Sequence, residues 1–351
     1  MAIRRLTIPG AAIGLLLAVA LPAAADAHRS GHHGYAATVL ATGPSPDADL
    51  VNGWGLSRSP TSPWWVSDNG TDLSTLYGAD GSKVPLVVAI PGGAPTGTVF
   101  NPSSTDFHGD AFLFSSEAGE ITGWRAALGT TAEVGNDQFA GSAVYKGLAI
   151  GTATVGSGPA SYLYATDFHD RRIDVFDASF AVQTWPGAFV DPKLPKGYGP
   201  FGIQDLDGRL FVTYAKTQPG SDDERAGQGR GIVDAFASDG TFLGRVASHG
   251  RLDAPWGLAL APKGFGRFGG DLIVGNFGDG TLHAYHRQDH HWHLDGTLRR
   301  THGKRVVVDG LWGIAFGGGT ATNGPIDTLF FVAGPNDEQG GAFGTITVGP
   351  S

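Results

Sequence analysis

A short motif with a central glycine recurs six times along the chain. Its copies are Trp54-Gly55-Leu56, Thr96-Gly97-Thr98, Lys146-Gly147-Leu148, Phe201-Gly202-Ile203, Trp256-Gly257-Leu258 and Trp312-Gly313-Ile314. The central glycines lie 42, 50, 55, 55 and 56 residues apart. Each copy opens a short apolar stretch, and a second apolar stretch follows within the same unit. A repeat of this length built from several short strands is typical of a β-propeller blade.

The repeat predicts an all-β fold, a six-bladed β-propeller that forms a single domain over residues 35–351. Gly and Pro make up 56 and 21 of the 351 residues and interrupt nearly every window long enough for an amphipathic helix. A glycine suits the innermost strand of a blade, because these strands crowd around the central channel, where a side chain would collide with its neighbours.

The two ends of this domain predict how the ring closes. The last unit ends with the strand-like stretch 344–348, and a spare stretch, 35–40, precedes the first unit. Pairing the two would complete the last blade and remove an exposed sheet edge. We therefore expect residues 35–41 to form the outer strand beside residues 343–348.

The first 27 residues have the features of a signal peptide. Arg4 and Arg5 precede an apolar run from Ala11 to Leu21, and small residues then allow cleavage after Ala25 or Ala27. Residues 28–34 would remain as a flexible, histidine-rich leader. Since no other stretch approaches the length of a membrane span, we expect a secreted protein, exported by general secretion.

Composition and missing motifs exclude several function classes. The formal net charge of −9 argues against nucleic acid as a partner. The chain has no cysteine, which excludes disulfides and cysteine-based metal sites. Motifs of serine hydrolases, zinc peptidases, P-loop enzymes and dinucleotide-binding dehydrogenases are also missing from the sequence. We expect a monomer.

Several longer motifs resemble an uncharacterised family of exported bacterial proteins. They are residues 52–56, 65–70, 167–177, 274–280 and 333–338. The likeness spans about residues 37–348, and more distantly the blades resemble NHL repeats and gluconolactonase-like propellers. The resemblance implies a propeller fold and no established activity. Some members end in a PEP-CTERM sorting tail, which this sequence lacks, and this favours release outside the cell.

The topology of a propeller places one group of side chains around a single mouth of the channel. The start of each innermost strand and the turn after each second strand lie at the same end of the blade. The predicted ligand-binding residues there are Trp54, Lys146, Phe201, Trp256, Trp312 and Lys216. Such aromatic rings can stack on a sugar. They can equally fill the junctions between blades, and only Thr96 and Lys146 depart from the pattern.

The same end carries a set of candidate metal ligands, namely Glu117, Asp167, His169, Asn276 and Asp337. Oxygen-rich sets of this kind suit Ca²⁺, Mg²⁺ or Mn²⁺, and the histidine also admits Zn²⁺. The alternative is that these side chains accept hydrogen bonds from the amides of tight turns. The long loop 217–230 should cover this mouth and could add Asp222, Asp223 and Glu224 as ligands.

Three functions follow as hypotheses. The leading one is binding of an extracellular carbohydrate, small molecule or protein at the mouth, without assigned catalytic residues. The alternative is a metal-dependent lactone or ester hydrolase of the gluconolactonase-like kind, in which a metal activates water. The third is copper binding by the leader, which contains His28, His32 and His33. A further run in the fifth unit, His286, His290, His291 and His293, could take up Zn²⁺ or Cu²⁺ adventitiously.

Overall fold

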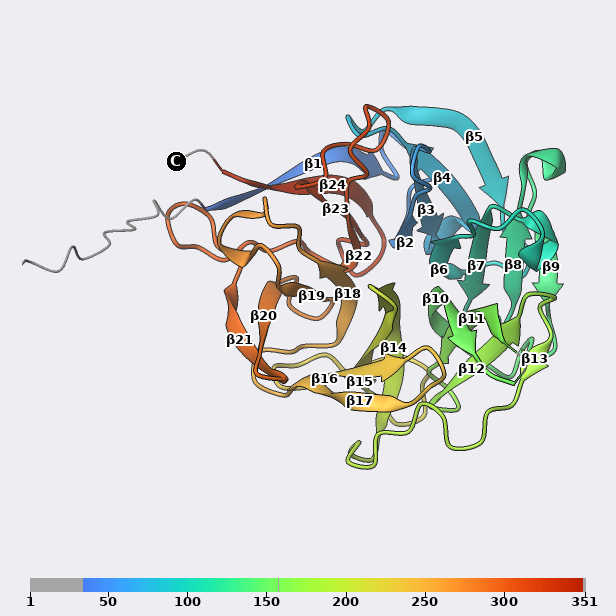
Figure 1. Ribbon diagram of the computed structural model, residues 1–351. Coiled ribbons are helices and arrows are strands. Elements are labelled where there is room, and N and C mark those ends of the chain that lie inside the picture. Colours follow the sequence, from blue (N-terminus) through green and yellow to red (C-terminus); the bar gives the residue numbers. More distant parts are fainter. Residues whose placement is uncertain (1–33, 157, 350–351) are drawn as a thin grey trace, which may run out of the picture. The chain divides into compact units, whose positions relative to one another are not determined.

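The computed structural model describes residues 34–156 and 158–349, which form six four-stranded antiparallel sheets around a central channel (Figure 1). Each innermost strand contacts the innermost strands of both neighbouring blades, so the ring is closed. The predicted signal peptide (1–27) and most of the leader (28–34) lie outside the described residues, and so does the proposed copper site.

The first three blades follow one another along the chain. Blade 1 consists of β2 (Gly53–Ser57), β3 (Trp64–Asp68), β4 (Leu73–Tyr77) and β5 (Lys83–Ala89). Blade 2 consists of β6 (Pro95–Phe100), β7 (Phe112–Ser116), β8 (Ile121–Trp124) and β9 (Glu133–Asn136). Blade 3 consists of β10 (Tyr145–Thr154), β11 (Pro159–Asp167), β12 (Arg172–Asp177) and β13 (Val182–Gln183).

The other three blades complete the ring. Blade 4 consists of β14 (Tyr198–Leu206), β15 (Arg209–Lys216), β16 (Gly231–Ala237) and β17 (Phe242–Ser248). Blade 5 consists of β18 (Pro255–Leu260), β19 (Leu272–Asn276), β20 (Leu282–Gln288) and β21 (His291–Thr297). Blade 6 consists of β22 (Leu311–Phe316), β23 (Leu329–Ala333), β24 (Gly341–Val348) and β1 (Tyr35–Gly43).

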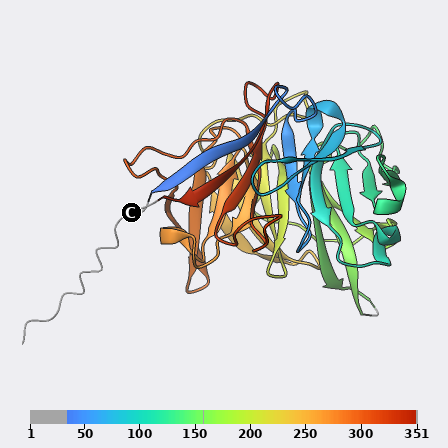
Figure 2. The same cartoon turned by 90° about the horizontal axis from the view of Figure 1, so that it is seen from above.

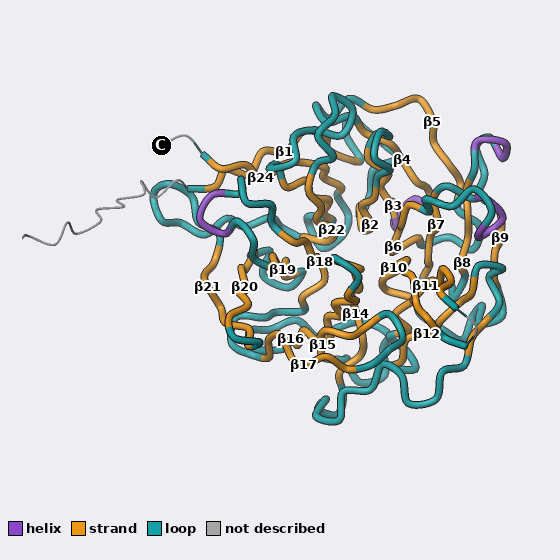
Figure 3. Tube along the Cα trace, in the orientation of Figure 1, coloured by secondary structure: helices purple, strands orange, loops and turns teal. Residues whose placement is uncertain are grey.

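Helix is confined to four short 3-10 turns in the described part of the chain (Figure 3). They are η1 (Asn69–Thr71), η2 (Asp106–Gly109), η3 (Ala126–Leu128) and η4 (Gly266–Phe268). None of the helices within residues 34–156 and 158–349 has the length and hydropathy of a membrane span.

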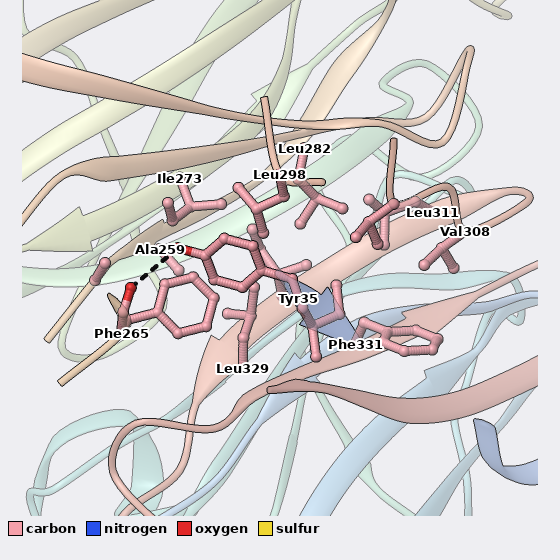
Figure 4. Close-up of a cluster of buried hydrophobic side chains, with 14 of the residues drawn as sticks. Tyr35, Ala259, Phe265, Ile273, Leu282, Leu298, Val308, Leu311, Leu329 and Phe331 are labelled. Atoms are coloured by element: carbon pink, nitrogen blue, oxygen red, sulfur yellow. Dashed lines mark hydrogen bonds between the residues drawn. The ribbon is translucent and has the colours of Figure 1, made fainter. Parts of the chain in front are cut away.

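The predicted ring closure is confirmed. Strand β1 pairs antiparallel with β24, with Tyr35 opposite Val348 and Gly43 opposite Gly341, and the two strands run side by side in Figure 2. The Tyr35 hydroxyl donates a hydrogen bond to the carbonyl of Phe265 (3.1 Å), which ties blade 6 to blade 5. Figure 4 shows this ring inside the apolar cluster between the two blades.

The six repeated glycines are required by close approach between blades, as predicted. A Cβ atom at Gly202 would lie 2.1 Å from the carbonyl oxygen of Trp256 in the next blade, far inside van der Waals contact. The other five meet the next innermost strand in the same way, at distances of 2.2–2.8 Å: Gly55, Gly97, Gly147, Gly257 and Gly313. The repeated glycines therefore allow the innermost strands of neighbouring blades to lie this close together.

Candidate functional site

The aromatic residues of the repeat meet at one end of the channel and pack against one another. Trp312 stacks on Trp54 with ring centroids 3.8 Å apart and on Phe277 at 3.9 Å, and it contacts Phe201 edge-on at 5.6 Å. The Trp256 indole donates a hydrogen bond to the carbonyl of Lys146 (2.8 Å), from blade 5 to blade 3. We call Trp54, Phe201, Trp256, Phe277 and Trp312 the aromatic plug, because their rings fill the channel at that end.

Burial limits what these rings can contact. Trp54 is 2% exposed, and Phe201 and Trp312 are fully buried, while Trp256 is half-buried. Thr96 is also buried and donates a hydrogen bond to the carbonyl of Tyr145 (2.8 Å). In this arrangement the rings serve as packing surfaces between blades. Their role in ligand binding stays a prediction.

Lys146 is the charged residue of the repeat, and it is buried beside the plug. Its side chain forms an ion pair with Glu117, and its Nζ lies 5.2 Å from the centroid of the Trp54 ring. Glu117 also accepts a hydrogen bond from the Asn69 amide (Nδ2 to Oε2, 3.0 Å). A buried ammonium group needs such a partner, because leaving it unpaired would cost several kcal/mol; the cation–π contact with Trp54 adds to this.

Hydrogen bonds extend from this ion pair across two further turns. Asn52 donates from Nδ2 to Asn69 Oδ1 (3.2 Å) and to Glu338 Oε1 (3.1 Å). Its Oδ1 accepts a hydrogen bond from the Trp312 indole (2.9 Å). Asn52 therefore connects the aromatic plug to side chains from blades 1 and 6.

The loop 217–230 covers this end of the channel, as expected. Asp222 contacts His169 of blade 3 (Oδ1 to Nδ1, 2.6 Å), and the amide of Gly227 donates to Asp253, which precedes blade 5. Ala226 lies beside Gly278, in the turn that follows β19. The loop is thus held by the turns of both neighbouring blades.

Glu224 brings a further carboxyl from this loop. Burial raises the pKa of Glu224 to about 7; the positive charge of Lys146 opposes this rise and Glu338 adds to it. Burial also raises the pKa of Glu338, against its hydrogen bond from Asn52, and Glu117 contributes to the rise. We call Glu117, Lys146, Glu224 and Glu338, with Asn52 and Asn69, the mouth cluster. Carboxyls with perturbed pKa values around one lysine are typical of functional sites.

Four of the five predicted metal ligands have protein partners of their own. Asp167 accepts hydrogen bonds from the backbone amides of Val144 and Asp170 (3.2 Å each), as the turn alternative expects. His169 pairs with Asp222, Glu117 with Lys146, and Asn276 donates to the carbonyl of Arg251 (2.9 Å). Asp337 is exposed in a turn with a φ of +51°. The metal hypothesis for these five residues stays a prediction.

In the described part of the chain, the group of acidic and histidine side chains that has the spacing of metal ligands is a different one, namely His108, Asp110 and Glu133. Arg125 donates hydrogen bonds to both carboxylates, at 2.7 Å to Asp110 and 2.6 Å to Glu133. The guanidinium group thus occupies oxygens that a cation would need. This set is better described as an ion-pair network.

Lys216 is the remaining residue of the predicted ligand-binding set. Lys216 ends β15, donates to the carbonyl of Lys196 (3.0 Å), and lies 4.9 Å from the Tyr198 ring. The far ends of the six innermost strands surround a cavity of about 510 Å³, which is lined both by aliphatic side chains such as Leu56 and Leu258 and by polar ones such as Arg58 and Asp205.

Fold and site together define the class of this protein: a six-bladed β-propeller whose channel is plugged beside a carboxylate-rich mouth. It belongs to the same family as "Uncharacterized protein L690" of Acanthamoeba polyphaga mimivirus, which is 31% identical over 293 residues, 77% of this chain and 74% of the viral protein. A comparison with models of known protein families finds no match. The viral relative does not support the family of exported bacterial proteins, some with a sorting tail, that the sequence resemblance suggested.

Solved structures confirm the fold. A glucose dehydrogenase superposes with a TM-score of 0.55 at 14% identity, covering 90% of this chain and 100% of the other. A streptogramin B lyase gives a TM-score of 0.53 at 10% identity, covering 90% and 98%. At this level of identity the likeness shows a shared propeller architecture.

Proposed function

We propose that this protein binds a neutral, hydroxyl-rich ligand, a carbohydrate, at the mouth cluster. The observation that carries the proposal is the hydrogen-bonded chain from Lys146 and Glu117 through Asn69 and Asn52 to Glu338. Carboxylates and amides that several blades hold in fixed positions are suited to pairs of sugar hydroxyls.

The charges of the cluster support this choice of ligand. Three glutamates of the cluster and two aspartates of the loop, Asp222 and Asp223, surround this end of the channel, and the ammonium of Lys146 is already paired with Glu117. The mouth cluster therefore has no free ammonium group with which to pair an anionic ligand. A sugar hydroxyl instead donates to a carboxylate oxygen, which accepts strong hydrogen bonds.

Binding can be tested by isothermal titration with neutral sugars chosen from a glycan-array screen. We expect Glu338→Gln to weaken the binding of a sugar at least about tenfold, because the amide replaces a charged acceptor with a weaker, neutral one. Glu120→Gln, in the same turn as Glu117, is the matched control and should bind as the unmodified chain does. Equal affinity in both variants, or no sugar bound at millimolar concentration, would contradict the proposal.

A hydrolase is the second candidate, because Glu224 has a pKa of about 7. A carboxyl group with that pKa can donate and accept a proton near neutral pH. Glu224→Gln should then abolish turnover of lactones or esters. The metal-dependent form of this hypothesis predicts about one equivalent of Ca, Mg, Mn or Zn by elemental analysis, lost in Asp167→Ala.

Export is the last part of the proposal. The charged and apolar pattern of residues 1–27 supports secretion into the extracellular space. Sequencing the N-terminus of the secreted protein should give Asp26 or His28 as the first residue. A protein that keeps Met1 and stays with the cells would contradict it.

A further inference from the structure

The hairpin β20–β21 of blade 5 carries histidines in a fixed register. Its two-residue turn, Asp289-His290, has φ values of 48° and 68°, as in the type I′ turn that joins strands of an antiparallel pair tightly. His286 lies directly opposite His293, and Gln288 lies opposite His291. Since residues two apart on a strand share a face, His286, His291 and His293 all lie on one face of the hairpin.

The opposite face anchors the hairpin. There Trp292 contacts Phe211 of blade 4 edge-on, with ring centroids 5.8 Å apart. The three histidines are all exposed. Directly opposed residues have Cα atoms about 5.5 Å apart when they exchange hydrogen bonds, and diagonal neighbours remain within reach of long side chains. Rotation of exposed side chains can therefore bring three imidazoles onto one ion.

A buried carboxylate orients one of these rings. His286 Nδ1 is 3.0 Å from Oδ1 of Asp271, a residue that is only 4% exposed. The second oxygen of Asp271 is buried and has no hydrogen-bond partner. A carboxylate that accepts Nδ1–H fixes the tautomer and leaves Nε2 as the free electron pair, an arrangement common behind metal-binding histidines.

We propose that His286, His291 and His293 form a surface site for a divalent transition-metal ion, with Asp271 holding His286 and water completing the coordination. Three neutral nitrogen donors favour Zn²⁺, Ni²⁺ or Cu²⁺ over Ca²⁺ and Mg²⁺, which prefer oxygen. The site lies on blade 5, apart from the mouth cluster, and does not depend on the proposed function.

The test is isothermal titration of the untagged full chain with ZnCl₂ and with NiCl₂ at about pH 7.5. We expect one ion to bind with micromolar affinity and His293→Ala to weaken it at least about tenfold. His302→Ala removes an exposed histidine elsewhere and is the matched control. Apart from the one substituted residue in each variant, the histidines are the same in all three proteins, so a loss of binding in His293→Ala alone points to the hairpin.

A second variant tests the role of Asp271. Asp271→Asn should lower the affinity for the ion about 10- to 100-fold, while circular dichroism shows an unchanged fold. Ion binding that is the same in the unmodified chain and in His293→Ala would assign the uptake to other histidines and overturn the proposal. Binding only at millimolar metal would overturn it as well.

Discussion

Acidification should destabilise this propeller through one buried histidine, His283. The side chain is 1% exposed and sits between two hydroxyls, Thr281 Oγ1 near its Nε2 and Thr297 Oγ1 near its Nδ1, both at 2.9 Å. The Thr281 hydroxyl donates to Asp279 (2.6 Å), so it accepts from Nε2–H. Nδ1 then accepts from Thr297. The network assigns a neutral ring with both nitrogens satisfied.

The size of the effect follows from the shift in pKa. Burial lowers the pKa of His283 from 6.5 to about 4. The unfolded chain therefore takes up a proton at a higher pH than the folded chain does. The stability that neutral His283 contributes is complete above about pH 6.5 and is lost as the pH falls toward 4. At about 1.4 kcal/mol per pKa unit, the loss amounts to about 3 kcal/mol.

Urea denaturation of the unmodified chain and of His283→Gln would measure this loss. Carboxyl groups titrate in both proteins, so their contributions cancel in the difference between the two free energies of unfolding. Between about pH 7 and about pH 4 that difference should move by about 3 kcal/mol in favour of the variant. Exposed His302→Gln is the control. Parallel pH curves for the unmodified chain and His283→Gln would refute the reasoning.

Two further substitutions test the packing around the channel. Trp312→Ala removes the centre of the aromatic plug and should lower the free energy of unfolding in urea by about 3–5 kcal/mol; a loss below about 1 kcal/mol would mean that the plug is not packed as described. Gly202→Ala places a methyl group 2.1 Å from the Trp256 carbonyl and should cost at least about 1–3 kcal/mol by thermal denaturation, whereas an unchanged melting temperature would contradict the close approach between blades.

The fold could be predicted because its main constraint, a glycine near the start of the innermost strand, occurs six times in the sequence. Every blade needs a glycine at the same point, as the 2.1–2.8 Å approaches to the neighbouring strand show, and needs an apolar second strand behind it. Ring closure could be predicted because blade 6 lacked a fourth strand and residues 35–41 had no other partner. Such constraints act through the backbone and through the alternation of apolar and polar residues along a strand. Both leave a pattern that can be read in the sequence.

The site could be predicted only in part. The direction of each side chain at the mouth depends on the packing and hydrogen-bond partners that the neighbouring blades supply. The spacing placed Trp54 and Trp312 at one end but did not show that they stack on each other. Asn52 precedes the first repeat and has no repeated equivalent, yet it links Trp312 to Glu338. Contacts of this kind depend on residues far apart in the sequence, which periodicity does not connect.

Lys146 carries the strongest link between the repeat and the proposed function. Thr96 also departs from the aromatic pattern, but its hydroxyl bonds to the Tyr145 carbonyl and so has a structural role. Lys146 is buried against Glu117 where other blades place a ring. Replacing a buried ion pair by apolar residues of similar size is often neutral or stabilising. Stability alone therefore does not account for this lysine, and the carboxyls that surround it are the reason why we propose a ligand site there.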